Sequence, residues 1–407
     1  MELHACFCFS YPPELQTIIL SVNEGILSDD GCIQVVSHQM LRRCIESALW
    51  KCCQNDSEGD DSTASERTRA PPSFLLSKVL ETQRLVETVM VSGEQPDLLQ
   101  SSATDLSQLF SYLLSWDLLL LHISLESVEE RPLYIQFLQR DSLLHKLLLA
   151  LFFLMPSCVP SVAVRSLAPD VLQQQRPPLV RTERWFDQRP VFHPSHRVTV
   201  EATEKVACYL YYQCLKLFPA VVRQWFNSLD KSTAASVDRF TTKYLSPILC
   251  SEHLDALSKH ERNVENLSIN VRSSVREVVA KYKTEDCTME LVVSLPAGYP
   301  LSQPKVEAKQ AAVNVELGRR WLLQLTVFFA HQNGSLLDGL LMWKRNIDRH
   351  LEGMEDCMIC MMTVHSANFQ LPKVTCRQCK KKFHGACLYK WFTTSSNSSC
   401  PLCRSPF

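Results

Sequence analysis

Apolar residues recur at three- and four-residue steps along most of the first 250 positions, the period of a helix that buries one face. Strand-like alternation is scarce there, and prolines stand near the expected ends of the periodic segments. The pattern therefore predicts a stack of buried helices. The periodic segments are 15–27, 35–53, 74–91, 105–123, 143–155 and 203–218.

This region is expected to span residues 1–245 as an α-helical, HEAT-like solenoid, although no crisp repeat length identifies a named repeat. Near 54–72 no apolar residue can anchor a core, which predicts a disordered insertion. The uncapped apolar run at 5–9 fits either the end of a longer solenoid or a shortened isoform. Residues 217–227 are expected to form a helix with Trp225 in its buried face.

Two apolar stretches invite comparison with membrane-spanning helices. Asp117 and His122 interrupt the first, 113–123, and prolines interrupt the second, 147–164. Because neither supplies about 20 uninterrupted apolar residues, buried core helices are expected and no membrane span.

The apolar period changes to two beyond residue 266, as in strands that bury one face. Pro300 and Pro304 predict a rigid turn between strands. We expect an α+β domain over 246–352, with three or four antiparallel strands packed on helices. The strand-like segments are 267–283, 287–295 and 305–313, and the helical ones are 317–331 and 335–350.

The last part of the chain, 353–407, carries eight potential metal ligands in the pattern C-x2-C-x15-C-x2-C-x4-H-x2-C-x12-C-x2-C. Structural zinc takes four such thiolate or imidazole ligands in a tetrahedron with no open position. Eight ligands therefore predict two structural zinc ions. The ligands are Cys357, Cys360, Cys376, Cys379, His384, Cys387, Cys400 and Cys403.

RING domains and PHD fingers both use this ligand order in an interleaved cross-brace. That arrangement assigns zinc 1 to Cys357, Cys360, His384 and Cys387, and zinc 2 to Cys376, Cys379, Cys400 and Cys403. PHD fingers usually carry an aromatic residue two positions before the seventh ligand, where this chain has Ser398. The residues between the ligands therefore favour a RING.

Four residues near the ligands carry the resemblance to RING-type ubiquitin ligases: Ile359, Trp391, Pro401 and Arg404. The resemblance implies that the three apolar residues form the groove for a ubiquitin-conjugating enzyme. It also implies that Arg404 touches both that enzyme and ubiquitin and so promotes transfer. Apolar side chains exposed on so small a module are typical of a partner surface.

Composition fits a multidomain protein of the cytosol. A net charge of −1 over 407 residues excludes a strongly basic nucleic-acid binder, so no specific DNA partner is expected. Eleven of the eighteen cysteines lie outside the zinc module without framework spacing, as expected of free thiols in a reducing compartment. Glu2, with no basic stretch before the first apolar residues, argues against a secretory signal.

The segment Tyr299-Pro300-x-x-x-Pro304 resembles the signature of RWD domains, which are related to ubiquitin-conjugating enzymes. No cysteine lies between Cys287 and Cys357, so this domain is expected to bind rather than catalyse. Helices, RWD domain and RING in this order are similar to the C-terminal portion of the listerin family of ribosome-associated quality control. The match is closest in CMIC, CRQCKKKFHGACLYKWF and CPLCR.

That resemblance implies docking on a 60S ribosomal subunit with a stalled nascent chain and quality-control factors, and ubiquitination of lysines on that chain. Zinc-bound thiolates in closed sites are poor nucleophiles, so ubiquitin is expected to pass directly from the conjugating enzyme to lysine. The ligase would restrain the enzyme–ubiquitin conjugate in a reactive pose. Two alternatives stay open: a PHD-like reader, and a RING that recruits partners without catalysing transfer.

Overall fold

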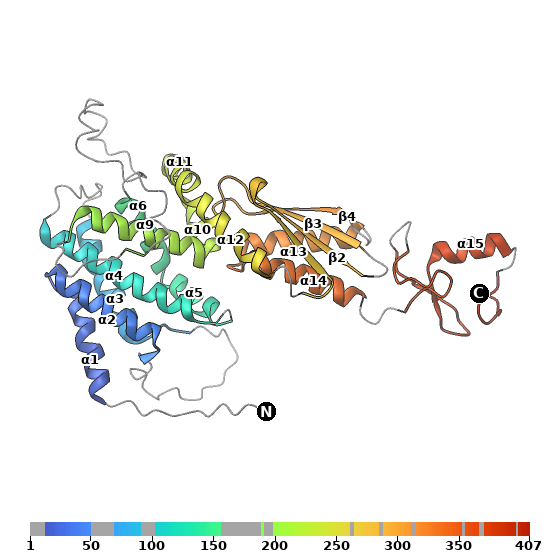
Figure 1. Ribbon diagram of the computed structural model, residues 1–407, viewed down its shortest axis with the longest axis horizontal. Coiled ribbons are helices and arrows are strands. Elements are labelled where there is room, and N and C mark those ends of the chain that lie inside the picture. The colour runs from blue at the N-terminus through green and yellow to red at the C-terminus, as the bar shows by residue number, and fades with distance from the viewer. Residues whose placement is uncertain are drawn as a thin grey trace. The chain divides into compact units, whose positions relative to one another are not determined.

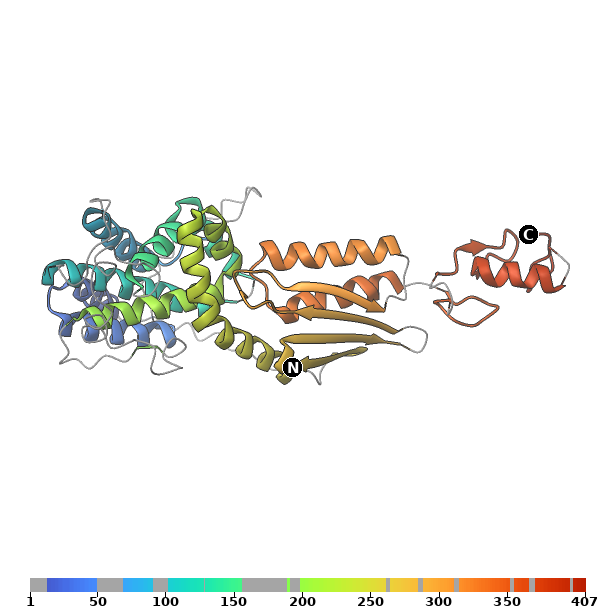
Figure 2. The same cartoon turned by 90° about the horizontal axis from the view of Figure 1, so that it is seen from above.

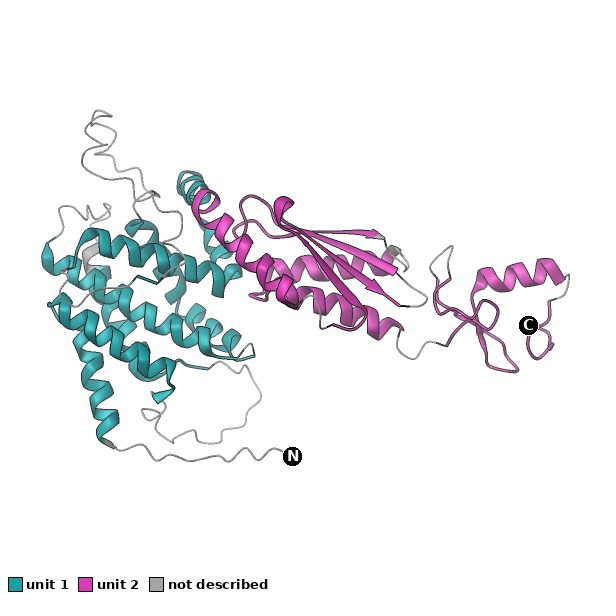
Figure 3. Ribbon diagram, in the orientation of Figure 1, with its two compact units in different colours: residues 1–240 teal, residues 241–407 magenta. Residues whose placement is uncertain are grey.

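A computed structural model describes residues 13–49, 69–90, 102–127, 129–155, 189–190, 198–260, 264–284, 288–310, 315–351, 355–365, 370–395 and 398–407. The chain forms two compact units, Met1–Phe240 and Thr241–Phe407 (Figure 3). The apolar run at 5–9 and most of the expected insertion near 54–72 lie outside the described residues, as does 156–164 of the second apolar stretch.

Unit 1 is helical throughout its described elements, as the periodicity predicted (Figure 1). Helix α4 is central and contacts α2, α3 and α9. It is apolar on nearly all sides because other helices surround it. The helices are α1 Pro13–Glu24, α2 Gly31–Glu46, α3 Ser73–Met90, α4 Ala103–Leu125, α5 Arg131–Arg140, α6 Leu143–Leu154, α9 Val200–Leu217, α10 Pro219–Ser228 and α11 Lys231–Phe240.

Among the described helices, α4 alone is long and apolar enough to cross a membrane, and 83% of its apolar window is buried inside the protein. Asp117, which interrupts this helix, is buried and paired. Its carboxylate lies 2.7 Å from Nε2 of His38 and accepts a hydrogen bond from Arg189 at 3.1 Å. These partners compensate for the cost of burying the charge. The length and burial of α4 are typical of a core helix.

Residues at the start of two helices explain why their boundaries differ from those that the sequence predicted. Pro219 occupies the first turn of α10, where its missing N–H costs nothing, and so begins a helix rather than ending one. Trp225 of α10 is 2% exposed, as the expected helix at 217–227 required. Helix α2 begins earlier than predicted because the side chain of Asp30 accepts the backbone N–H of Cys32 at 2.8 Å.

Unit 2 contains a four-stranded antiparallel sheet in the order β1-β2-β3-β4, with helices alongside it (Figures 1 and 2). The segment 267–283 forms two strands rather than one, because a 3-10 turn, Ser273–Val275, and a left-handed Arg276 (φ 54°) reverse the chain. The strands are β1 Leu267–Arg272, β2 Glu277–Lys283, β3 Thr288–Ser294 and β4 Lys305–Gln310, and the helices are α12 Ser246–His260, α13 Val315–His331 and α14 Leu336–Leu351.

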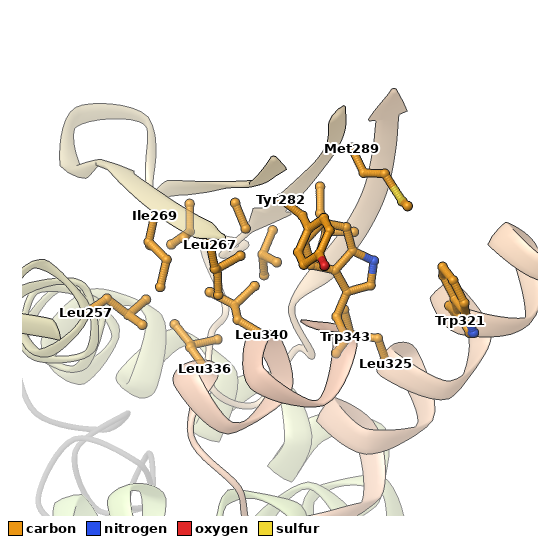
Figure 4. Packing of buried hydrophobic residues seen from close by; sticks show 14 of the residues in the cluster. Leu257, Leu267, Ile269, Tyr282, Met289, Trp321, Leu325, Leu336, Leu340 and Trp343 are labelled. Carbon is orange, nitrogen blue, oxygen red and sulfur yellow. The ribbon is translucent and has the colours of Figure 1, made fainter. Parts of the chain in front are cut away.

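One hydrophobic core joins the sheet to these three helices (Figure 4). Tyr282 of the sheet and Trp343 of α14 lie in it, and Leu257 brings α12 into the same cluster. The hydroxyl of Ser246 also donates to the carbonyl of Ala297 at 2.7 Å. Helix α12 therefore packs as part of the α+β domain.

Candidate metal centre

The structure gathers the eight predicted ligands into two groups of four. Within each group, all ligand atoms lie within 4.8 Å of one another. The first group is Cys357, Cys360, His384 and Cys387, and the second is Cys376, Cys379, Cys400 and Cys403. Because each group joins pairs that are distant in sequence, the chain adopts the interleaved cross-brace.

Sulfur–sulfur distances in the second group fit a tetrahedral zinc. Sγ of Cys376 lies 3.7 Å from Sγ of Cys403, and Sγ of Cys379 lies 3.8 Å from Sγ of Cys400. A tetrahedron with Zn–S bonds of about 2.3 Å has edges of about 3.8 Å. A disulfide would bring two sulfurs to about 2.05 Å. The geometry therefore favours thiolates around one cation over disulfides.

Three of the four ligand pairs each form a backbone turn of the same kind, a knuckle. In the last one, the N–H of Arg404 donates to the carbonyl of Cys400 at 3.0 Å, and the N–H of Cys400 donates to the carbonyl of Ser405 at 2.9 Å. The residue after each C-x2-C is left-handed, with φ of 56° to 58°. These residues are Met361, Lys380 and Arg404. None is glycine or asparagine, so the residue type at this position did not predict a left-handed backbone.

The fourth pair, His384 and Cys387, stands at the start of helix α15, Gly385–Ser395, which covers the predicted short helix. Nδ1 of His384 lies 3.3 Å from Sγ of Cys360, while Nε2 lies 3.2 Å from the carbonyl of Thr363. An Nε2–H that donates to this carbonyl leaves Nδ1 free to bind a metal. Burial lowers the pKa of His384, which favours the neutral ring that coordinates.

The thiols differ in how readily they ionise. A hydrogen bond from the backbone N–H of Cys379 lowers the pKa of Cys376 to about 6. Burial and neighbouring thiols raise the pKa of Cys387 to about 12. A dication has to displace the remaining protons to gain a full set of thiolates. The donor set therefore suits a metal that prefers thiolate, as zinc does.

The three predicted groove residues lie at or near the surface of the zinc module. The Nε1–H of Trp391 donates to the carbonyl of Ser399 at 3.2 Å, although the side chain is 38% exposed. Ile359 and Pro401 are half-buried, and Ile359 also packs on the core. Sequence reasoning did not single out Leu402, an apolar residue of the last knuckle that is 46% exposed.

Arg404 is exposed at the end of the last knuckle, with its backbone bonded to Cys400. Among the residues that the structure describes, none forms an ion pair with its guanidinium, and the side chain is exposed to a partner. In the α+β domain, Tyr299 of the RWD-like turn is buried, and its hydroxyl lies 2.6 Å from Nδ1 of His253 on α12. These contacts position the turn. Cys287 lies outside the described residues.

Comparison with known families finds three regions in the same order, although the first match extends through most of α12. The model of the LTN1 family HEAT repeat region matches residues 12–258, that of the ubiquitin conjugating domain-like family matches 267–350, and that of the Ring finger domain matches 355–404. The chain belongs to the listerin family. The Ring finger match and the two Cys/His groups identify a zinc-binding module.

Listerin relatives align along nearly the whole chain. E3 ubiquitin-protein ligase listerin of Gallus gallus is 36% identical over 97% of this chain, and so is that of Mus musculus. The Drosophila melanogaster protein is 38% identical over 81% of the chain. This chain covers 22% of the chicken and mouse proteins and 18% of the fly protein. The chain therefore spans about a fifth of these relatives' length.

Proposed function

We propose that this chain is a RING-type ubiquitin ligase that recruits a ubiquitin-charged conjugating enzyme and promotes direct transfer to lysine. One observation carries the proposal: every cysteine of the zinc module faces one of two four-ligand groups. No thiol is left there to accept ubiquitin, and the α+β domain has no cysteine from residue 288 to 351. These two observations support transfer without a covalent intermediate on the ligase.

Each four-ligand group would hold one zinc ion, so the chain would carry two. Four protein ligands complete a tetrahedron and leave no position for water or substrate. Zinc supplies structural cross-links when bound. The interleaved groups would tie the three knuckles and α15 together and thereby form the surface presented to a partner.

Ile359, Trp391 and Pro401 are the proposed contacts for the conjugating enzyme. They come from the first knuckle, α15 and the last knuckle, and the bond from Trp391 to Ser399 ties α15 to the segment that leads into Cys400. Leu402 adds exposed apolar area beside Pro401. Tryptophan is among the residues most enriched where binding energy is concentrated at interfaces, which supports Trp391 as the anchor.

Arg404 is proposed to promote transfer by positioning. Its backbone is bonded to the knuckle, while its exposed side chain carries several N–H donors on a planar fork. Such a group can bridge the conjugating enzyme and ubiquitin and restrict the motion of the thioester. Restraining two flexible partners in a reactive geometry lowers the entropic part of the barrier.

The substrate proposal concerns stalled nascent chains on 60S ribosomal subunits, in the cytosol, together with quality-control factors. Membership of the listerin family supports it. The α+β domain, which has a fold related to conjugating enzymes but no cysteine after the turn at Tyr299–Pro304, is the proposed docking domain. The helices of unit 1 would add to this binding surface.

Reconstitution tests the activity. The purified chain is mixed with activating enzyme, a panel of conjugating enzymes, ubiquitin and ATP, and ubiquitin ladders are expected with at least one conjugating enzyme. A Cys376→Ser chain is the control. Binding to a charged conjugating enzyme without ladders would indicate a recruiting scaffold. Neither binding nor ladders would favour a PHD-like reader.

A further inference from the structure

Ser405 differs from its counterparts in the other two knuckles. Its carbonyl accepts the N–H of Cys400 at 2.9 Å, as the carbonyls of Met362 and Lys381 accept the N–H groups of Cys357 and Cys376. Methionine and lysine perform this backbone role without a hydroxyl. The side-chain oxygen of Ser405 is therefore not needed to form the knuckle.

That hydroxyl lies against the sulfurs of the second ligand group. Oγ of Ser405 is 2.9 Å from Sγ of Cys403 and 3.8 Å from Sγ of Cys376. A zinc-bound thiolate has no proton, so the hydroxyl has to be the donor. Cys403 is also the one exposed cysteine among the eight ligands, so its sulfur would be the most accessible to competing solutes.

The second group also has the greater need of such a donor. Four thiolates with one Zn²⁺ carry a formal charge of −2, whereas three thiolates, a neutral histidine and one Zn²⁺ carry −1. Hydrogen bonds from surrounding groups to ligand atoms offset excess charge and orient the ligands. The hydroxyl of Ser405 is placed at the site with the larger negative charge.

We propose that Ser405 is a positioning residue that retains zinc at the second site by donating a hydrogen bond to the thiolate of Cys403. The inference rests on the proposed occupancy of both groups by zinc. Because Arg404 lies between Cys403 and Ser405, the same bond would hold the backbone beneath the guanidinium. Loss of surrounding hydrogen bonds typically lowers metal affinity about 10- to 100-fold.

The test measures zinc release to a chelator from the full chain, its Ser405→Ala and Ser405→Thr variants, and a Ser398→Ala control. Ser405→Ala should release one of two zinc ions about 10- to 100-fold more readily. Ser405→Thr, which keeps the hydroxyl, should restore retention, and Ser398→Ala should match the parent. Alkylation and mass spectrometry should show that the freed thiols belong to the second group, with Cys403 among them.

A cobalt-loaded chain gives a second readout that a general loss of stability would not move. A hydrogen bond lowers the energy of the thiolate lone pairs, so removing it in Ser405→Ala should shift the thiolate-to-cobalt absorption to longer wavelength. The proposal would be overturned if Ser405→Ala released zinc at the parent rate, or if Ser405→Ala and Ser405→Thr lost zinc equally fast. A parent chain that binds fewer than two zinc ions contradicts the proposed function itself, and this inference with it.

Discussion

The indole N–H of Trp391 donates to the carbonyl of Ser399 across 3.2 Å and ties α15 to the chain that enters the last knuckle. A side chain that is 38% exposed thus has its polar group satisfied within the module, while its ring remains accessible. The bond links the helix that carries Trp391 to the segment that leads to Pro401, two of the three proposed enzyme contacts. This contact between α15 and the last knuckle supports the proposed enzyme-binding residues independently of their spacing in the sequence.

Zinc is expected to be required for the fold of the last 50 residues. Structural sites in small zinc modules bind with apparent free energies of about 10–16 kcal/mol, which is folding energy because the site does not exist in the unfolded chain. Chelation, or Cys376→Ser, should remove protection of α15 against hydrogen exchange while β1–β3 stay protected by their own core. Metal analysis should find two zinc ions. One zinc, or a protected α15 without metal, would contradict this.

Ile359→Ala should weaken binding of the conjugating enzyme by about 1–3 kcal/mol if the side chain anchors the interface. Because Ile359 also packs on the core, zinc content and thermal stability have to be measured in parallel. Met361→Ala is the matched control, since Met361 lies next to the same ligand pair and is 65% exposed. Binding titrations in which both variants lose equal affinity would remove Ile359 from the interface.

Arg404→Ala should leave zinc content and enzyme binding nearly unchanged but slow discharge of the ubiquitin thioester onto free lysine. Alanine bears the same left-handed backbone cost as arginine at φ 58°, so the knuckle should keep its shape. Arg404→Lys should recover little activity, because an ammonium lacks the planar fork. Single-turnover discharge of the ubiquitin thioester measures the effect. If Arg404→Ala discharges ubiquitin at the parent rate, Arg404 does not promote transfer, and the module only recruits the conjugating enzyme.

Deleting residues 246–352 should abolish co-sedimentation with 60S subunits and leave formation of free ubiquitin chains largely intact. The deletion removes the sheet and its three helices together, and it leaves two residues of their shared core, Val364 and Leu371, in the zinc module. If the shortened protein still forms ubiquitin chains, its zinc module is folded. Normal sedimentation of the shortened chain would place ribosome binding in the helices or the RING.

Mild acid should destabilise unit 1 through His122 of α4. Burial lowers the pKa of His122 from 6.5 to about 4, so the native state holds a neutral ring that the unfolded chain protonates. This stabilisation is complete above about pH 6.5 and is lost as pH falls towards 4. At 1.36 kcal/mol per pKa unit, the loss amounts to about 3 kcal/mol.

His122→Phe is the matching variant, because it keeps an aromatic ring near Tyr134, whose centroid lies 5.4 Å from that of His122. Denaturant unfolding, followed by pulse-labelling of α4 peptides, should show a weaker dependence on pH between 6.5 and 4 in the variant. An unchanged slope would assign the acid sensitivity to other groups.

Much of this protein was determined by short-range sequence patterns. Apolar periodicity predicted the central helix α4, and alternation predicted the strands that include Met289 and Leu291. The spacing of the eight ligands predicted a metal module, because a C-x2-C pair can turn its two sulfurs towards one ion without help from the rest of the chain. Such signals are local, so they can be read before any tertiary contact is known.

Contacts between distant segments decided the rest. The turn at Arg276 splits one alternating stretch into β1 and β2, and it carries no glycine or proline to announce it. Three residues of α12, Cys250, Leu254 and Leu257, pack in the core of the α+β domain, in contact with segments distant in sequence. The bond from Trp391 to Ser399 and the approach of the Ser405 hydroxyl to Cys376 likewise join separate segments. Sequence spacing determined which residues can bind metal, whereas packing determined which groups surround them and what they present to a partner.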